Sequence, residues 1–307
     1  KLYDNALSQI NPYGANLAFL SVHHPDVIDF ITTKESSHLA CFGTSVVLTR
    51  EFMRAVEEDK MYELRDPHTT RVISTVRARS VFDILTTLAW RTGDPAVVFL
   101  ENLNKAPTNP FDDRLIEATT PTGEHPLFPL EGCFTASINL ARHVVGTDFD
   151  WDKLKKTVWS GVHLLDNTID VCSYPIPLLE DAMKSTRRIG LGVMGWADVL
   201  ILLGIPYNSS DALKLGEKVM KFVGSEARDA SAALARKRGC FGAYKKSAYA
   251  KKSEKMRNAA RTTVTHGAVP SIIAGCSQGI EPYYAVSYLK KTPTTESFEV
   301  ISLFEEV

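Results

Sequence analysis

The pattern of apolar and polar positions predicts strands alternating with helices along most of the chain. Short apolar runs are typical of strands, and those that are apolar throughout predict burial on both faces. The predicted strands are residues 15–22, 45–48, 96–100, 137–140 and 262–264. Longer segments repeat apolar residues every three or four positions, which predicts amphipathic helices. The predicted helices are residues 25–34, 50–59, 80–93, 151–169, 196–203 and 210–238. This alternation predicts a single α/β layer or barrel.

Polar residues at several helix ends support these boundaries. Thr49 and Asp150 each precede an apolar-periodic segment, so we expect their side chains to cap the helices that follow. Ser80 and Asp83 have the spacing of a capping box. Gly239 follows three cations and predicts the end of the longest helix, in which Leu213 is expected to face inward.

Three segments permit more than one structural interpretation. Residues 60–77 predict a polar β-hairpin or a loop. Residues 187–195 have a glycine spacing that suits either a phosphate-binding loop or close helix packing, and we favour packing because no strand clearly precedes them. Residues 266–270 predict a loop, and residues 271–275 predict a strand or a turn.

A proline-bearing loop at residues 117–127 interrupts this regular pattern. Pro121, Gly123 and Pro126 disfavour a helix or a long strand, and Glu124 lies among hydroxyl side chains. The loop is either a surface turn with a solvated carboxylate or a segment that presents chemistry. His125 is either an acid–base partner of Glu124 or a capping or solvated side chain, and we favour the second for a lone histidine.

Composition excludes several classes of protein. The 307 residues are 44% hydrophobic and 23% charged with a net charge of −1, which argues against a strongly basic nucleic-acid surface. The basic stretch 245–257 is therefore expected to be a solvated face. No apolar run approaches the ~20 residues of a membrane span. The five dispersed cysteines predict reduced thiols in a cytoplasmic protein, and no histidine spacing predicts a metal site. The start at Lys1, without an initiator Met, indicates a fragment or a processed chain.

Several longer motifs together resemble one family. The sequence resembles the catalytic subunit of ribonucleotide reductase, most closely its coenzyme-B12-dependent branch. The resemblance runs from near residue 14 to the end of the chain and covers the middle and later part of a family subunit. The motifs are Gly14-Ala15-Asn16, His24-Pro25-Asp26, Ser137-Ile138-Asn139-Leu140, Leu165-Asp166-Asn167, residues 186–195, Arg257-Asn258-Ala259, residues 273–277 and Gly279-Ile280-Glu281-Pro282.

The resemblance implies a fold, an activity and a set of partners. The family fold is a ten-stranded α/β barrel with a central finger loop, and residues 1–307 are expected to form its middle to C-terminal portion. The family activity is the radical reduction of ribonucleotides to deoxyribonucleotides. The implied cofactor is adenosylcobalamin, and the implied ligands are a ribonucleotide substrate and a nucleotide effector. A homodimer, or association with the missing N-terminal portion, is also implied.

The resemblance assigns the proline-bearing loop to the finger. The family finger reads Asn-Pro-Cys-Gly-Glu, and this chain has Thr120-Pro121-Thr122-Gly123-Glu124. Glu124 corresponds to the residue that takes the proton of the ribose 3′-hydroxyl, and Thr120 to the asparagine that holds the substrate. Thr122 stands where the family has its radical cysteine. Cys133 corresponds to one thiol of the pair that reduces the substrate.

Other positions correspond to binding segments of the family. The effector loop would include Tyr13 and Gly14. The implied substrate-binding residues are Cys41, Gly43, Ser45, Gly123, His266, Gly267, Ala268 and Val269. Three hypotheses follow: a reductase, a relative or fragment that binds nucleotide or a partner without reducing it, and a structural protein or a sequence altered at its functional positions.

Overall fold

The computed structural model describes residues 16–36, 42–265, 267–291, 296–301 and 303–306. The chain divides into two compact units, Lys1–Pro129 and Leu130–Val307. Each unit has its own cluster of buried apolar side chains, so each is described by itself.

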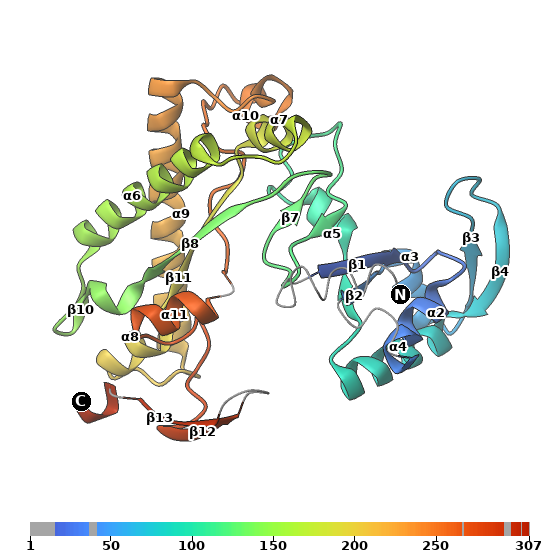
Figure 1. Cartoon of the computed structure of the whole chain (residues 1–307), viewed down its shortest axis with the longest axis horizontal. Helices are drawn as coiled ribbons and strands as arrows, with labels where there is room; N and C mark the ends of the chain where they lie inside the picture. The colour runs from blue at the N-terminus through green and yellow to red at the C-terminus, as the bar shows by residue number, and fades with distance from the viewer. Residues whose placement is uncertain (1–15, 37–41, 266, 292–295, 302, 307) are drawn as a thin grey trace. The chain divides into compact units, whose positions relative to one another are not determined.

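The first unit is built on a parallel sheet with the order β1-β2-β5 (Figure 1). Strand β1 (Asn16–Ser21) pairs with β2 (Phe42–Val47), and β2 pairs in turn with β5 (Ala96–Val98). Helices α2, α3 and α4 pack beside this sheet around Val46, Phe52 and Leu85, all of which are buried. Because parallel neighbours need crossover connections, the intervening helices follow directly from the sheet order.

The remaining elements of the first unit join or extend this sheet. Residues 60–77 form the expected hairpin. The Thr49 side chain accepts a hydrogen bond from Phe52 N and caps α3 as expected. The other elements are α2 (Val27–Thr32), a 3-10 helix (Thr33–Ser36), α3 (Arg50–Glu57), β3 (Met61–Arg65), β4 (Val72–Arg77), α4 (Ala78–Thr92), α5 (Leu100–Lys105), β6 (Ala118–Thr119) and β7 (Pro126–Leu127).

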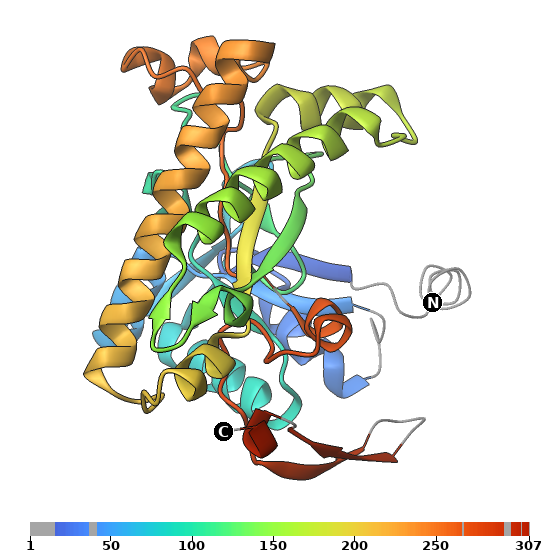
Figure 2. The same ribbon diagram turned by 90° about the vertical axis from the view of Figure 1, so that its left-hand side faces the viewer.

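The second unit packs two long helices against a pair of parallel strands. Strand β8 (Phe134–Asn139) pairs with β11 (Ile189–Met194), and Leu191 of β11 forms a further parallel bridge to Thr262. Helix α6 (Trp151–Val171) contacts β8, β11 and the longer helix α9 (Ser210–Arg238). Both views show α6 and α9 running side by side (Figure 1 and Figure 2). The buried faces of these four elements form most of the second core, and Trp196, Val199 and Leu200 of α8 (Trp196–Leu202) add to it.

Shorter elements complete the second unit. The side chain of Asp150 accepts a hydrogen bond from Lys153 N and caps α6 as expected. The remaining elements are a 3-10 helix (Leu140–His143), β9 (Val144–Val145), β10 (Asp148–Phe149), α7 (Pro177–Thr186), α8 (Trp196–Leu202), a 3-10 helix (Tyr244–Lys246), α10 (Ala248–Lys251), α11 (Ala268–Ala274), β12 (Ser287–Lys291), β13 (Glu296–Val300) and α12 (Leu303–Glu306).

Some sequence-based expectations are wrong. The glycine run of residues 187–195 contains the fully buried strand β11, so it is neither a phosphate loop nor a helix-packing stripe. Its glycines allow close approach of a neighbouring segment, since a Cβ on Gly192 would lie 2.7 Å from Thr265 Oγ1. Residues 271–275 belong largely to helix α11 rather than to a strand or turn.

Three predictions about single positions also fail. Helix α4 begins at Ala78 and has no side-chain cap, so Ser80 and Asp83 lie inside the helix and form no capping box. Val97 of β5 is 44% exposed instead of buried, because β5 is the last strand of the described sheet. Leu213 is 76% exposed, while its neighbour Ala212 is buried in the core.

The predicted α/β class is confirmed, with parallel strands and helices in each unit. Among the described residues, the parallel strands form one three-stranded and one two-stranded sheet. Closure into a ten-stranded barrel stays a prediction, and so does the assignment of residues 1–307 to one barrel domain. Within the described part of the chain, no helix is both long and apolar enough to cross a bilayer.

Candidate active site

The predicted finger is the tip of a short antiparallel hairpin in the first unit. Strands β6 and β7 pair through Ala118 with Leu127 and Thr119 with Pro126. Across the tip, Thr120 N donates to His125 O at 2.9 Å, and Gly123 N donates to Thr120 O at 2.9 Å. Gly123 has φ +83°, a conformation that glycine adopts without strain. The sequence therefore closes a tight turn that holds residues 120–125 together.

Side chains at the base fix the hairpin to its own unit. Asn104 of α5 donates from Nδ2 to Ile116 O at 2.9 Å and accepts from Ile116 N at 2.7 Å through Oδ1. The ring of Phe128, just after β7, packs edge-on against Phe111 with centroids 5.5 Å apart. Because both ends of the loop are held, the tip has little freedom to fold back.

Two threonine hydroxyls converge on the carboxylate of Glu124. Thr120 Oγ1 donates to Glu124 Oε2 at 2.8 Å, and Thr122 Oγ1 donates to the same oxygen. Burial opposes ionisation of this carboxyl. Hydrogen bonds from Thr122, the Glu124 backbone amide and Thr120 outweigh burial and hold the pKa of Glu124 below its usual value. Glu124 is therefore an ionised, partly buried hydrogen-bond acceptor at neutral pH.

The histidine beside Glu124 is more enclosed than the sequence suggested. His125 is only 2% exposed, so the expectation of a solvated side chain is wrong. Its backbone amide donates to Thr120 Oγ1 at 3.1 Å, which adds to the closed tip. His125 also contributes, after the hydrogen bonds, to the lowered pKa of Glu124.

Cys133 lies in the second unit, immediately before β8. The thiol is partly buried and contacts Phe134 O at 3.6 Å. The segment before it is anchored by Glu131, whose Oε2 accepts from Arg188 Nε at 3.1 Å and whose Oε1 accepts from Thr186 Oγ1. Cys133 and the finger belong to different units, so each is described within its own unit.

The predicted binding residues fall into three groups. In the first unit, Gly43 and Ser45 lie on β2, and Gly123 lies in the finger. Ser45 is buried and pairs with Phe19 and Ala96. In the second unit, Gly267 precedes α11, and Ala268 and Val269 are the first residues of that helix. Residues Tyr13, Gly14, Cys41 and His266 lie outside the described residues.

A buried charge cluster in the second unit was not predicted. Asp166 of α6 is fully buried, and its carboxylate accepts from Arg187 Nε at 2.8 Å and from Arg257 Nε at 3.2 Å. Asn258 Nδ2 also donates to Asp166 at 3.1 Å. These residues belong to motifs shared with the family, but no local pattern in the sequence indicates that they pair.

Arg187 links this cluster to a second aspartate on α6. Its NH1 donates to Asp170 Oδ1 at 2.7 Å. The hydrogen bond from Arg187, followed by the Arg187 and Arg257 charges, outweighs burial and holds the pKa of Asp170 below its usual value. Arg187 lies two residues before β11, and Arg257 lies five residues before Thr262. The cluster therefore holds together the chain ahead of two adjacent parallel segments.

A second polar cluster joins α8 to the segment after α11. Tyr283 Oη donates to Asp198 Oδ1, and Ser277 N donates to Asp198 Oδ2 at 2.8 Å. Burial, followed by the Asp198 charge, raises the pKa of Cys276 to about 11. Cys276 is therefore a protonated thiol at neutral pH, which makes it a poor nucleophile. Among the described residues, no group of three or more His, Cys, Asp or Glu side chains could hold a metal ion.

Comparisons with known proteins identify the scaffold. The sequence profile described as "Ribonucleotide reductase, barrel domain" matches residues 1–266. The chain belongs to this family. The vitamin B12-dependent ribonucleoside-diphosphate reductase of Thermoplasma acidophilum is 43% identical over 298 residues, which cover 95% of this chain and 38% of that protein. The enzyme of the same name from Mycobacterium tuberculosis H37Rv is 40% identical over 314 residues, 100% of this chain and 44% of that protein.

A viral relative is more distant. The putative ribonucleoside-diphosphate reductase large subunit of Frog virus 3 is 29% identical over 299 residues. The chain spans less than half the length of the two vitamin B12-dependent relatives. It is a ribonucleotide reductase-like protein, and the expected resemblance to the large subunit of the B12-dependent branch is confirmed.

Proposed function

We propose that this chain forms the part of a ribonucleotide reductase-like barrel that presents Glu124 to the sugar of a bound ribonucleotide. The observation that carries the proposal is the finger geometry, in which a closed hairpin tip holds an ionised carboxylate between two hydroxyl groups. A carboxylate with a lowered pKa is a strong hydrogen-bond acceptor at neutral pH. The hydroxyl groups of a ribose are suitable donors.

The roles of the individual tip residues follow from their contacts. Glu124 accepts a hydrogen bond from a sugar hydroxyl. Thr120 orients Glu124, because its hydroxyl donates to the carboxylate and accepts from His125 N. Gly123 keeps the turn tight and offers no side chain that would obstruct the sugar. Gly43 and Ser45 in the first unit, and Gly267, Ala268 and Val269 in the second, stay proposed nucleotide-binding residues on the family resemblance.

The tip does not suit radical chemistry driven by adenosylcobalamin, although relatives are named vitamin B12-dependent. Thr122 carries an alkyl O–H group, whose bond is stronger than the S–H bond of a cysteine. A carbon radical from the cofactor would gain little by taking this hydrogen, and Thr122 already donates its hydrogen to Glu124. We therefore assign no reaction step to the cofactor in this chain.

A second candidate function is nucleotide binding without reduction. Thr122 favours it, because the residue that would start the reaction lacks a thiol. Cys133 supplies one thiol, and a two-electron reduction needs a pair that can form a disulfide. Such a relative would bind ribonucleotides, or associate with another subunit, without forming deoxynucleotides.

Calorimetric titration with a ribonucleoside diphosphate such as CDP tests the proposed site. The protein is expected to bind CDP, and Glu124→Gln is expected to weaken binding about tenfold, because a hydrogen bond to a charged group contributes about 1.5 kcal/mol or more. Glu117→Gln is the matched control, since Glu117 is an exposed carboxylate at the base of the same hairpin.

Two results would count against the site. If the wild-type protein binds no CDP, the chain presents no ribonucleotide site of its own. If Glu124→Gln and Glu117→Gln bind CDP equally, Glu124 does not contact the nucleotide.

A further inference from the structure

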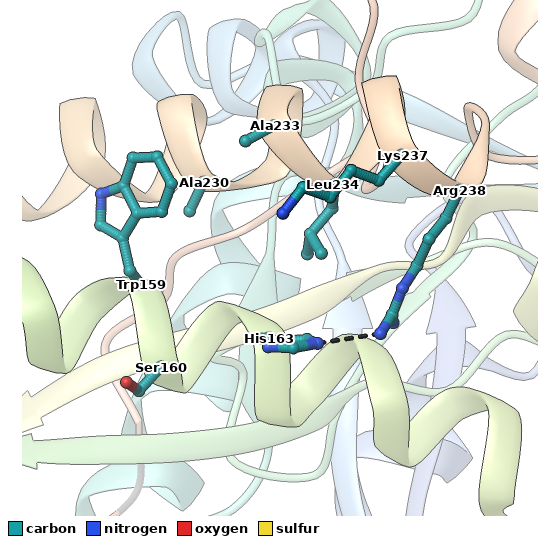
Figure 3. Close-up of a pocket in the computed structure, with 8 residues that line it drawn as sticks. All are labelled: Trp159, Ser160, His163, Ala230, Ala233, Leu234, Lys237 and Arg238. Atoms are coloured by element: carbon teal, nitrogen blue, oxygen red, sulfur yellow. Dashed lines mark hydrogen bonds between the residues drawn. The ribbon is translucent and has the colours of Figure 1, made fainter.

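A cavity of about 350 Å³ lies in the groove between α6 and α9, within the second unit (Figure 3). None of the residues assigned to the nucleotide site lines it. Two of the α9 residues that line it, Ala230 and Ala233, have small side chains and leave room between the helices. Figure 3 shows Trp159 at one end of the groove and the paired side chains of His163 and Arg238 at the other.

The aromatic end of the groove is held in place. Trp159 Nε1 of α6 donates to Glu226 Oε2 of α9 at 2.7 Å, which holds the indole against α9 at this end of the groove. Glu226 is itself paired with Lys155 at 3.3 Å, so its charge is compensated. The Trp159 indole is therefore held in place at this end of the groove, and the negative charge of Glu226 beside it is balanced by Lys155.

The opposite end presents hydrogen-bond donors. A guanidinium can only donate, so the 2.9 Å contact between Arg238 NH2 and His163 Nε2 makes Nε2 the acceptor. With Nε2 as the acceptor, Nδ1 is the ring nitrogen that can donate to a ligand. Lys237, which also lines the cavity, forms no hydrogen bond or ion pair with any described residue.

The local charge balance is positive. The ion pairs of the buried cluster, as far as the chain is described, join Asp166 and Asp170 to Arg187, Arg238 and Arg257. Two carboxylates against three guanidinium groups leave one positive charge in excess, and Lys237 adds another. The cavity lining contains no carboxylate. An anion is therefore favoured at this end of the groove.

We infer that the α6–α9 groove binds a small ligand in which a flat aromatic ring is joined to a phosphate, as in a nucleoside monophosphate. The ring packs against Trp159, and the phosphate accepts hydrogen bonds from His163 Nδ1–H and the ammonium of Lys237, beside Arg238. Ala230 and Arg238 are ~12 Å apart along the axis of α9, a length that accommodates such a molecule. This site is separate from the finger and does not depend on the function proposed for Glu124.

Fluorescence titration with AMP tests the inference, because Trp159 supplies an optical signal in the groove. AMP is expected to change the tryptophan emission saturably, and Trp159→Phe is expected to lose most of that change. Adenosine and inorganic phosphate, each lacking one half of the ligand, are expected to bind at least about tenfold more weakly. The Glu124→Gln variant is expected to leave the signal unchanged.

A matched pair of lysine variants separates specific binding from general attraction to a basic surface. Lys237→Gln is expected to weaken AMP binding at least about tenfold, because it removes a donor that has no other partner among the described residues. Lys221→Gln is the control on the same helix, where the lysine is exposed and paired with Glu217. Circular dichroism and the unfolding midpoint check that both variants fold.

Three outcomes would overturn the inference. One is equal binding of AMP and inorganic phosphate, which would remove the aromatic component. Another is equal loss of affinity in the Lys221 and Lys237 variants, which would indicate non-specific attraction. The third is an AMP signal that survives in Trp159→Phe and disappears in Glu124→Gln, which would place the nucleotide at the finger instead.

Discussion

At the scale of single residues, the protonation state of Glu124 depends on its burial and on hydrogen bonds from its neighbours. Hydrogen bonds from Thr122 and Thr120 favour its ionised form, and burial opposes it. We predict that Thr122→Val raises the pKa of Glu124, because valine has a similar shape and lacks the donor. Carbon-detected NMR titration of the Glu124 carboxyl measures this value. A pKa in Thr122→Val equal to or below that of the wild type would contradict the assigned hydrogen bond.

His143 provides a second test at this scale. Burial, together with the charge of Lys153, lowers the pKa of His143, while the hydrogen bond to Asn139 O opposes the shift. The folded protein thus binds fewer protons at this site than the unfolded chain, whose histidine pKa is about 6.5. Stability from His143 is therefore complete above that value and is lost as the pH falls through the lower folded-state pKa.

The expected result is a fall in the urea midpoint of unfolding as the pH is lowered from about 7 to below about 6.5. In His143→Gln this part of the pH dependence should be absent, because glutamine does not titrate. Similar slopes for wild type and variant across this interval would show that other groups control the acid sensitivity.

At the scale of elements, strand β11 depends on the absence of a side chain at Gly192. A Cβ there would lie 2.7 Å from Thr265 Oγ1 and 3.1 Å from Thr263 O. We predict that Gly192→Ala lowers the free energy of unfolding by about 1–3 kcal/mol, the usual effect of overpacking.

Gly224→Ala is the matched control for that substitution. Gly224 lies inside α9, and a Cβ added to it would meet no atom within 4 Å. Alanine should therefore raise stability there by about 0.5–1 kcal/mol, because it lowers the entropy of the unfolded chain. Chemical denaturation compares the two variants, and equal effects of both would exclude close packing at Gly192.

Some elements could be predicted from the sequence alone, and others could not. The caps at Thr49 and Asp150 and the hairpin of residues 60–77 followed from local signals, because the residues involved are neighbours in the chain. Strand β11 was missed because glycine is unusual in a strand, and the reason for Gly192 is its close approach to Thr263 and Thr265, which are far away in sequence. The loop at residues 117–127 was singled out by its prolines and glycine, and its assignment to the family finger stays a prediction. The convergence of Thr120 and Thr122 on Glu124 could be seen only in the folded turn.

At the scale of the whole molecule, the buried charges of the second unit connect distant segments. Asp166 is fully buried and joins α6 to Arg187, Arg238 and Arg257. We predict that Asp166→Ala lowers the free energy of unfolding by about 3–5 kcal/mol, because it removes the fully buried counter-charge of Arg187 and leaves only the partly exposed Asp170 to pair with it. Glu217→Gln, which removes an exposed partner of Lys221, should change the urea midpoint little.

The Asp166 prediction would be contradicted by an unfolding midpoint in Asp166→Ala close to that of the wild type. Such a result would mean that water replaces the carboxylate. The sequence pointed to Asp166, Arg187 and Arg257 only as parts of family motifs, since pairing between residues so far apart is not visible in a local pattern.

We propose that residues 120–124 keep the family's carboxylate as Glu124 and have Thr122 in place of the residue that starts the reduction. An anaerobic assay of the protein with adenosylcobalamin, CDP and a dithiol, with product separated by chromatography, tests it most directly. We predict CDP binding without deoxycytidine diphosphate, because Thr122 offers no thiol. Deoxynucleotide formed above the level of a protein-free control would contradict this account of the finger.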